Sequence, residues 1–496
     1  MRDEVLVVGA GVGGLTTAAL LAARGVRVCV LERESRAGGC ATPFAHGGYE
    51  FDAGAGLYAG WQADEIHARV FAELPVAPPE ARRLEPAYVV RLPDMTDVRV
   101  GGASAEEFAA TLRAAFPECA DAAVNFYREL GPLADALRRS AHRVPALASA
   151  TKFERMKLLA SEPRLASKLR ALEGDCVAQH LTDTSARFRR FIDAQLQLFT
   201  QTTSEACAYL FAAVALTEPL RGLYAIDGGA TALIDALVAA IKTSGGTIRF
   251  DAPVLRLAYD SSGQAVGVEL LSGERIEAAR AIVSNLTVWD TYGKLVGLKQ
   301  TPADVRAQLR AAHAWGAYLI FAELDAQACT RLPAPRILAL TAWPQDQAYD
   351  PASAQLMFNV AAEAATHTDR RAVTISTFTD AAQWFTYHED ESAHEAQDQA
   401  MLETWWARLH AALPELGDRI EVVETATPRT YYEQTRRKFG MIGRVNLASA
   451  SGAHTFTQRT TLPNLYMVGD TVFPGASCAA VTHSALIVAN EIAPKR

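Results

Sequence analysis

Apolar residues near the N-terminus form two short uninterrupted runs, at residues 5–8 and 26–31. Runs of this length are typical of strands that are buried on both faces. Between them lie several glycines and then an apolar stretch of helical length, which Gly25 ends. The pattern therefore predicts a strand, a tight turn, a helix and a second strand, which is the repeating unit of parallel sheets.

The rest of the chain shows both helical and strand periodicity. Residues 61–224 are expected to be mainly helical, because apolar positions recur there every three or four residues. Short alternating runs later in the chain predict strands, and some of them predict an antiparallel sheet. The further elements expected are helices at 106–116, 126–139, 233–242 and 482–492, a strand at 247–250, a hairpin at 266–270 and 276–283, and sheet strands at 317–324 and 373–378.

The glycines of the first turn have a spacing with a chemical meaning. Gly9, Gly11 and Gly14 form G-x-G-x-x-G, and Gly13 adds a further glycine. Such a turn lets the backbone approach a pyrophosphate at a helix N-terminus. Glu32 ends the second strand at about 20 residues from the motif, where an acid can accept both ribose hydroxyls. The stretch predicts a dinucleotide site and favours FAD or NAD over NADP.

Composition and net charge limit the classes of molecule that the chain is expected to bind. The chain has 496 residues, of which 50% are hydrophobic and 21% charged, and its net charge is −8. An acidic chain is a poor binder of nucleic acid. The seven cysteines are scattered without a C-x-x-C pair, so neither a disulfide framework nor a metal site is expected. Residues 5–23 lack charge, but their glycine turn favours the nucleotide unit over a membrane span or signal peptide.

A family resemblance becomes specific after Glu32. The chain continues through Arg33 and a Gly-Gly turn to residues 47–60, GGYEFDAGAGLYAG. This order resembles flavoproteins of the amine oxidase and phytoene desaturase superfamily. It is closest to their carotenoid branch of phytoene desaturases, carotenoid isomerases and retinol saturases. The resemblance implies FAD as the cofactor, with contacts from Arg33, Gly39, Cys40, Ala41 and Thr42.

Three later stretches extend the resemblance. Residues 225–290 look like the return to the nucleotide domain, where the backbone of Val254 would touch the adenine side of FAD. Residues 191–227 resemble the carotenoid C-3',4' desaturases, in which such a segment forms part of the substrate chamber. Their aromatic residues suit either a packed core or a tunnel lining. Residues 427–440 carry Arg429, Arg436 and Arg437, which either contact a polar end of the substrate or form surface salt bridges.

The closing motif, residues 462–481, resembles the flavin end of the same site. Asp470, after Gly469, matches the acid that binds the ribityl chain. Backbone N–H groups at the start of the next helix would face flavin N1 and O2; the residues concerned are Ser477, Cys478, Ala480 and Val481. Cys478 is either a reactive thiol or a packed small residue. His483 is the candidate general base, the alternative being a histidine packed behind the cofactor.

The resemblance implies an α/β fold with a Rossmann-type FAD-binding domain of the glutathione-reductase-2 type. An interleaved α+β substrate domain, with an antiparallel sheet and a helical part, is expected between its pieces. The expected division is 1–60, 225–290 and 456–496 for the FAD-binding domain, 61–224 for the mainly helical region, and 291–455 for the second part of the substrate domain.

The expected activity is hydride transfer between flavin and an apolar conjugated chain. The leading expectation is a desaturase of a carotenoid or similar isoprenoid, with oxygen or a quinone reoxidising the flavin. The alternatives are a cis–trans isomerase or saturase that uses reduced FAD, an amine oxidase, and a flavin-free lipid-binding relative like the Rab escort proteins. Retention of Gly9, Gly11, Gly14, Glu32 and Asp470 argues against the last.

Residues 138–170 form a basic stretch interleaved with apolar side chains in an otherwise acidic chain. Such a segment either lies on an anionic membrane surface or is a solvated helix face. The expected location is cytoplasmic, with peripheral contact to the inner face of the membrane through this stretch.

Overall fold

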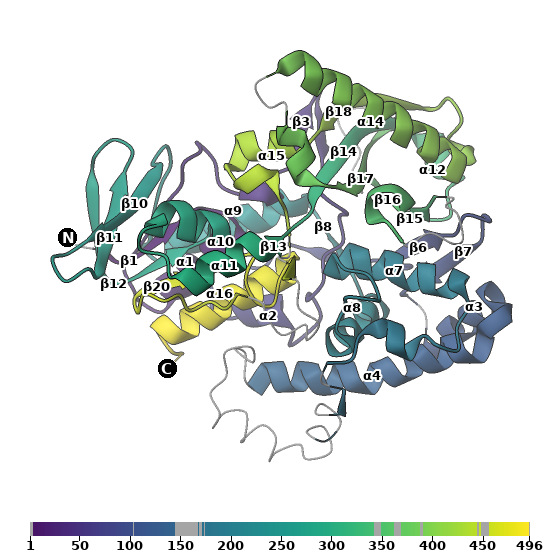
Figure 1. Cartoon of the computed structure of the whole chain (residues 1–496), viewed down its shortest axis with the longest axis horizontal. Coiled ribbons are helices and arrows are strands. Elements are labelled where there is room, and N and C mark those ends of the chain that lie inside the picture. The colour runs from purple at the N-terminus through teal and green to yellow at the C-terminus, as the bar shows by residue number, and fades with distance from the viewer. Residues whose placement is uncertain are drawn as a thin grey trace.

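A computed structural model of the chain describes residues 3–102, 104–143, 167, 171–172, 174–341, 349–361, 369–386, 390–443, 446–447 and 456–495. Two large sheets organise the molecule. Figure 1 shows one of them on the left, beside both chain termini, and the other at the upper right, with a group of long helices below it.

The first sheet is a parallel sheet of the predicted Rossmann type with an antiparallel extension. Strand β12 is long enough to serve both parts: its first half pairs antiparallel with β11, and its second half pairs parallel with β1. Strand β20 pairs parallel with the end of β12, which also pairs with β1, so the sheet joins strands from both ends of the sequence. The strands are β1 (Asp3–Val8), β2 (Val28–Leu31), β9 (Thr247–Arg249), β10 (Val254–Tyr259), β11 (Ala265–Leu270), β12 (Arg275–Ser284) and β20 (Leu465–Met467).

Three helices cover this sheet: α1 (Val12–Ala23) packs against both α9 (Gly229–Thr243) and α16 (Cys478–Ile492). Helix α1 is buried along almost its whole length. Gly14 makes this close approach feasible, because a Cβ atom there would overlap the carbonyl oxygen of Gly9 and press on Val7. The first and last parts of the chain thus form one packed layer.

The second sheet has seven strands in the order β18-β14-β17-β16-β15-β6-β7. All its pairs are antiparallel except β15 with β6. Its strands are β6 (Tyr88–Arg91), β7 (Asp97–Val100), β14 (Gly316–Asp325), β15 (Arg336–Leu340), β16 (Gln355–Val360), β17 (Arg370–Thr379) and β18 (Ile420–Ala426).

Residues 61–224 are mainly helical, but they also contain strands β6 and β7, which were not expected there. These two strands complete the second sheet. Each has only four residues, and β6 is buried on both faces, so neither shows a period that sequence could distinguish. Strand β5 (Ala81–Arg83) also lies there and pairs with β8 (Tyr224–Ile226).

The helical part of the region contains α3 (Ala105–Ala115), α4 (Ala120–Arg143), α7 (Ala186–Thr200) and α8 (Tyr209–Arg221). Helix α4 packs on α8, where Arg138 ion-pairs with Glu218 at 2.8 Å. Arg138 therefore belongs to a helix–helix contact and not to a basic outer face. Most of the remaining basic stretch, residues 144–166 and 168–170, lies outside the described residues.

Shorter elements connect these layers. They are α2 (Ile66–Phe71), α10 (Val288–Asp290), a π-helix (Thr291–Gly297), α11 (Ala303–Ala311), α12 (Ala326–Cys329), α13 (Pro351–Ala354), α14 (Glu391–Ala412), α15 (Pro428–Thr435) and the strand pairs β3 (Phe44–His46) with β4 (Tyr49–Phe51) and β13 (Ala312–His313) with β19 (Asn446–Leu447). Single 3-10 turns lie at Gly39–Ala41, Pro117–Cys119, Val177–His180, Ala381–Phe385, Pro414–Leu416 and Lys438–Gly440.

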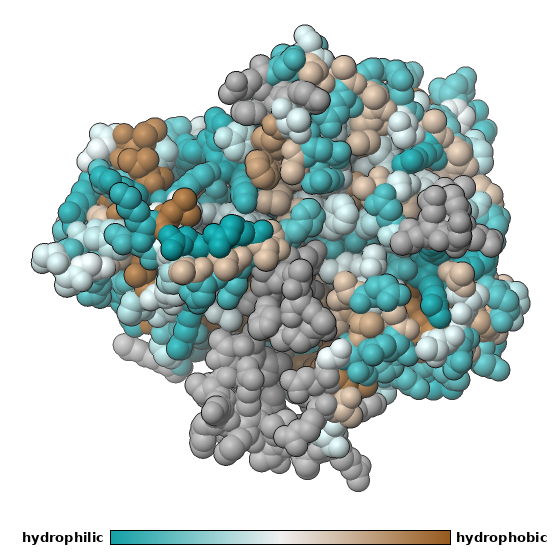
Figure 2. All heavy atoms as spheres, viewed as in Figure 1, coloured by the Kyte–Doolittle hydropathy of each residue, from teal (hydrophilic) through white to brown (hydrophobic). Residues whose placement is uncertain are grey.

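Figure 2 shows that polar side chains cover much of one face, while hydrophobic residues gather over the end of β10 and β11. Leu255, near the start of β10, and Leu271, directly after β11, are 48% and 67% exposed, and the two strands pair at this point. Among the described helices, none has both the length and the apolar character required to span a bilayer.

Candidate cofactor and substrate site

A cavity of about 930 Å³ lies where the parallel strands end. Val8, Leu31 and Asn285 follow or end β1, β2 and β12, and all three line it. Ligands of open α/β sheets bind at the carboxyl ends of the strands. The cavity extends from there to one face of the second sheet, where Leu319 and Met357 line it. Its volume lies near the upper end of the roughly 300–1,000 Å³ of small-molecule sites.

The glycine turn forms one end of the cavity as bare backbone. Cβ atoms placed on Gly11 and Gly13 would lie 2.6 and 2.7 Å from the side-chain amide of Asn285. Glu32 borders the same end: Oε2 accepts the N–H of Ala10 at 2.6 Å, and Oε1 accepts the N–H of Glu34 at 2.9 Å. The carboxylate is thus fixed beside the turn, while Gly11 caps the N-terminus of α1 without a side chain.

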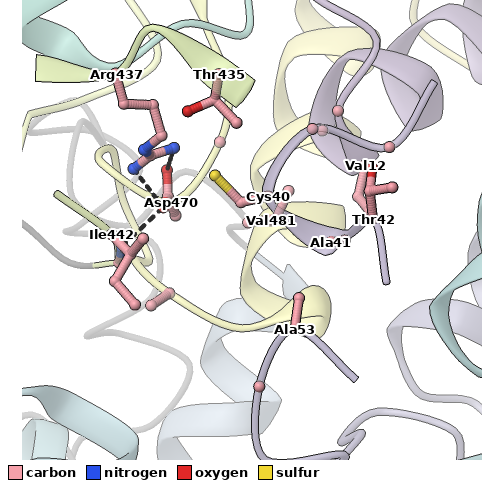
Figure 3. Close-up of a pocket in the computed structure, with 18 of the residues that line it drawn as sticks. Val12, Cys40, Ala41, Thr42, Ala53, Thr435, Arg437, Ile442, Asp470 and Val481 are labelled. Carbon is pink, nitrogen blue, oxygen red and sulfur yellow. Dashed lines mark hydrogen bonds and ion pairs between the residues drawn. The ribbon is translucent and has the colours of Figure 1, made fainter. Parts of the chain in front are cut away.

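A buried ion pair, Arg437 with Asp470, also lines the cavity, in addition to the glycine turn and Glu32. Arg437, after α15, donates to Asp470 with Nη2–Oδ2 at 2.8 Å and Nη1–Oδ1 at 3.2 Å, and the N–H of Gly443 adds a bond of 2.9 Å. Figure 3 shows Arg437 and Thr435 reaching toward Asp470 and Cys40 from one wall of the cavity. The two charged side chains are only 13% and 22% exposed.

Electrostatics keep this pair charged. Burial alone would lower the pKa of Arg437, but the carboxylate of Asp470 outweighs burial and the pKa is raised. Burial raises the pKa of the neighbouring Cys40 thiol, although the Arg437 charge opposes the shift. The cavity therefore contains a paired cation and anion beside a neutral thiol.

The start of α16 forms the adjoining wall. The hydroxyl of Ser477 accepts the N–H of Ala480 at 3.2 Å, and the carbonyl of Ser477 accepts the N–H of Val481 at 2.9 Å. Cys478 lines the cavity, and burial raises its pKa to about 11, so its thiol stays neutral. This favours the packed small residue over the reactive thiol.

The face of the second sheet gives the cavity an apolar part. Strand register places Ala317, Phe378 and Gln355 side by side in one row, and Leu319, Ser376 and Met357 in the next. These six residues line the cavity together with Leu57, Leu198 and Ile442. Leu198 comes from α7, so the segment expected to form a substrate chamber contributes to this wall.

A third row of the same sheet face is polar and binds residues 52–56. Thr374 donates to the carbonyl of Asp52 at 3.0 Å, Asn359 Nδ2 to Asp52 Oδ2 at 3.0 Å, and Arg336 Nε to the carbonyl of Gly56 at 3.2 Å. A Cβ atom on Gly56 would lie 2.7 Å from Asn359 Nδ2 and 2.9 Å from Asp52 Oδ2. The row brings Asp52 to the cavity, where Tyr58 also lines the wall.

Most of the residues expected at the site come together in this one cavity. Those that line it are Gly9, Gly11, Gly13, Glu32, Arg33, Gly39, Cys40, Ala41, Thr42, Val254, Gly469, Asp470, Ser477, Cys478 and Val481. Gly14, Ala480 and His483 do not line it: Gly14 packs α1 on the sheet, and His483 lies beyond Val481 on α16.

Several lining residues were not expected at the site. Asn285 could have been proposed because it follows a parallel strand. Asp52 and Tyr58 lie within the quoted 47–60 stretch, but their approach to the cavity depends on a sheet that forms far away in the chain. Arg429 forms outer ion pairs with Glu391 and Glu433, whereas Arg437 is the buried partner of Asp470.

The residues present fit FAD. The turn borders the cavity as bare backbone, and a Cβ atom on Gly11 or Gly13 would clash with the Asn285 side chain. The N-termini of α1 and α16 and the acids Glu32 and Asp470 border one continuous cavity. Helix N-termini suit phosphates and anionic groups, and carboxylates suit ribose and ribityl hydroxyls. Among the described residues, no group of three or more metal-ligating side chains occurs.

Comparison with known proteins gives relatives over nearly the whole chain. Prolycopene isomerase from Arabidopsis thaliana is 25% identical over 507 residues, which cover 99% of this chain and 82% of that protein. All-trans-retinol 13,14-reductase from Danio rerio is 27% identical over 340 residues, covering 61% of this chain and 50% of that protein.

Solved structures share the fold. An oxidoreductase from Methanosarcina mazei has a TM-score of 0.64 at 16% identity and covers 98% of this chain and 99% of its own. Putrescine oxidase bound to putrescine has a TM-score of 0.66 at 15% identity, with complete coverage of both chains.

The family model described as flavin containing amine oxidoreductase matches residues 12–493, which run from the start of α1 through the second sheet to the end of α16. This match agrees with the FAD cradle and with an enzyme whose chemistry its flavin carries. The chain therefore belongs to the flavin-containing amine oxidoreductase family, and its cofactor is FAD.

Proposed function

We propose that this protein is an FAD-dependent cis–trans isomerase of double bonds in an apolar polyene, and that double-bond reduction is the second candidate. The observation that carries the proposal is the apolar face of the second sheet, which continues the cofactor cavity without a break. Leu319, Met357 and Phe378 offer a hydrocarbon chain a surface beside the nucleotide end. Apolar walls with few polar groups suit such a ligand.

The chain's own residues would hold the cofactor and orient the substrate. Glu32 and the glycine turn would hold the adenosine half, and Asp470, paired with Arg437, would hold the ribityl chain. FAD, when bound, supplies hydride acceptance and donation at its N5 atom. The apolar rows of the sheet would align the polyene and exclude water from the reacting carbons.

The relatives support isomerisation over the desaturation that was first expected. The prolycopene isomerases match 99% of this chain, and the retinol reductases match about three fifths of it. Desaturation stays a weaker proposal, and it would require oxygen or a quinone as the electron acceptor. Contact with the membrane through residues 138–170 and a cytoplasmic location also remain proposals.

The test uses the purified holoprotein under anaerobic conditions. Poly-cis and all-trans polyenes are mixed with the oxidised and with the reduced protein, and products are separated by chromatography with the flavin spectrum recorded in parallel. Isomerisation gives products of unchanged mass, and reduction gives products two hydrogens heavier. Bleaching of the oxidised flavin by substrate, with products two hydrogens lighter, would instead identify a desaturase and overturn the proposal.

A cavity-filling variant shows whether the sheet face is the substrate surface. Met357→Trp adds bulk to an apolar row away from the glycine turn. The variant should retain its flavin and lose polyene binding. Val422→Trp on β18, the edge strand of the same sheet, is the matched control, because Val422 is 38% exposed and does not line the cavity.

A further inference from the structure

Two polar side chains line the apolar part of the cavity and have no role so far in binding the cofactor or the substrate. Asp52 and Tyr58 both line it, next to the residues expected to contact the polyene. The carboxyl group of Asp52 receives one hydrogen bond from the described residues, from Asn359 to Oδ2, which leaves Oδ1 without a protein partner. The Tyr58 hydroxyl likewise forms no hydrogen bond with the described residues. Both residues are half-buried and line the cavity, so their free oxygens are open to a ligand bound there.

We infer that Asp52 is the proton donor of the polyene site. The inference rests on the proposed isomerase function. The polar row of the second sheet holds the donor in place, since Thr374 binds the Asp52 carbonyl and Asn359 binds one carboxyl oxygen. The other oxygen remains available to carry a proton.

The surroundings of Asp52 favour the protonated carboxyl. Burial raises its pKa, and this effect exceeds the opposing ones of the Asn359 hydrogen bond and the Arg336 charge. Arg336 itself lies on β15. Burial lowers the pKa of Arg336, and the nearby charge of Arg82 on β5 lowers it further. On the other sides, burial keeps the Tyr58 hydroxyl and the Cys478 thiol neutral, because it raises both pKa values.

The proposed step balances without any oxidant or reductant. The O–H bond of Asp52 breaks, and the π electrons of one double bond form a new C–H bond with its proton. The positive charge spreads over the remaining conjugated double bonds, and the former double bond rotates as a single bond. The Asp52 carboxylate then removes a proton from the same carbon, and the double bond re-forms in the other geometry. General acid catalysis of this kind contributes typically about 10²–10⁴-fold.

The decisive variants are Asp52→Asn and Thr374→Val. The first removes the proton and keeps the shape, and the second removes a hydrogen bond to the same loop but keeps the carboxyl. With reduced holoprotein in D₂O, wild type should isomerise the polyene and place deuterium on a vinylic carbon. Thr374→Val should still incorporate deuterium, at a lower rate, because it loosens the loop but keeps the proton donor. Asp52→Asn should lose at least about 100-fold in rate, together with the deuterium incorporation. Turnover or incorporation in Asp52→Asn within threefold of wild type would overturn the inference.

An infrared measurement tests the same group without turnover. The difference spectrum between wild type and Asp52→Asn holoproteins at neutral pH should contain the C=O band of one protonated carboxyl group, which disappears at high pH. A spectrum with only an ionised carboxylate would overturn the inference.

A third variant leaves Asp52 intact, in case Asp52→Asn does not fold. Asn359→Ala removes the hydrogen bond that stabilises the ionised carboxyl, so the pKa of Asp52 should rise further. Because the donor must be protonated, the rate falls as pH rises through that pKa, and the fall should move to higher pH in the variant. An unmoved profile would show that Asp52 only holds its loop. Wild-type protein that binds FAD but isomerises no polyene would refute the proposed function instead.

Discussion

Arg437 and Asp470 form a two-bond ion pair, at 2.8 and 3.2 Å, between two segments that enclose the cofactor cavity. Arg437 follows α15, and Asp470 follows β20 of the first sheet. The pair does not stand alone, since Arg33 donates to the carbonyl of Gln434 at 2.9 Å and Lys294 to that of Arg436 at 3.1 Å. Arg33, Lys294 and Arg437 therefore hold the end of α15 and the segment after it against the nucleotide end of the cavity.

Replacing Arg437 should weaken both the fold and cofactor retention. Arg437→Ala leaves the Asp470 carboxylate buried without its cation, and removing one partner of a buried pair costs about 3–5 kcal/mol. We expect a fall of that order in the free energy of unfolding, measured by denaturant titration, and a lower ratio of flavin to protein.

The control for this variant is Arg256→Ala, which breaks the exposed ion pair with Glu269 on β10 and β11. It should change stability and flavin content little. Arg437→Lys should lie between wild type and Arg437→Ala, because lysine keeps the charge but lacks the two-pronged geometry. Equal flavin content in all three variants would rule out a role of Arg437 at the cofactor.

Glu32 should contribute strongly to FAD affinity. Its carboxylate is fixed beside the glycine turn by the N–H groups of Ala10 and Glu34. Hydrogen bonds to a charged group are worth about 1.5–3 kcal/mol, so Glu32→Ala should raise the Kd for FAD by roughly 10–100-fold. Titration of the apoprotein by flavin fluorescence measures this. Glu34→Ala is the control, and an equal loss in both variants would count against a ribose contact of Glu32.

Gly14 should not tolerate a side chain. A Cβ atom there overlaps the carbonyl of Gly9, so Gly14→Ala must push α1 away from the sheet, which costs about 1–3 kcal/mol or more. Gly293→Ala in the π-helix Thr291–Gly297 meets no atom within 4 Å and should stabilise the protein by about 0.5–1 kcal/mol. Thermal unfolding should show a lower melting temperature than wild type for Gly14→Ala and a slightly higher one for the second variant. A neutral Gly14→Ala would mean that the helix does not depend on this close approach.

His67 should make the protein less stable in acid. Its side chain is 1% exposed and stacks on Trp61 with ring centroids 4.5 Å apart, and burial lowers its pKa to about 3. As pH falls below the unfolded value of 6.5, the unfolded chain binds a proton that the folded protein does not. Between pH 6.5 and pH 5 this should remove about 2 kcal/mol of stability. In His67→Phe the loss over that interval should be smaller by the same amount, as measured by urea unfolding at each pH.

The sequence was most informative where local pattern and chemistry coincide. The glycine turn, Glu32 and the closing Gly469-Asp470 are each identifiable from neighbouring residues alone, and all of them line one cavity. The short strand β6 could not be predicted, because four buried residues fit a strand and a buried helix equally well.

The polar row of Thr374, Asn359 and Arg336 could not be predicted from the sequence, for a different reason. Asp52 meets Asn359 only because β16 and β17 pair in one particular register, and that register is a property of the whole sheet. For the same reason Arg437 could not be distinguished from Arg429, which carries the same charge eight positions earlier. One of them is buried against Asp470, and the other forms ion pairs on the outside.

The packing of α1 against α16 has a consequence for biosynthesis. A ribosome releases the glycine turn early, but Asp470 and α16 emerge about 460 residues later. At about 5–20 residues per second, that interval is roughly 23–92 s. Throughout it the first sheet lacks strand β20, the partner of β12, and helix α16, which packs on α1. The nucleotide pocket is thus completed only after the second sheet has been synthesised, and FAD can be captured only once α16 has emerged.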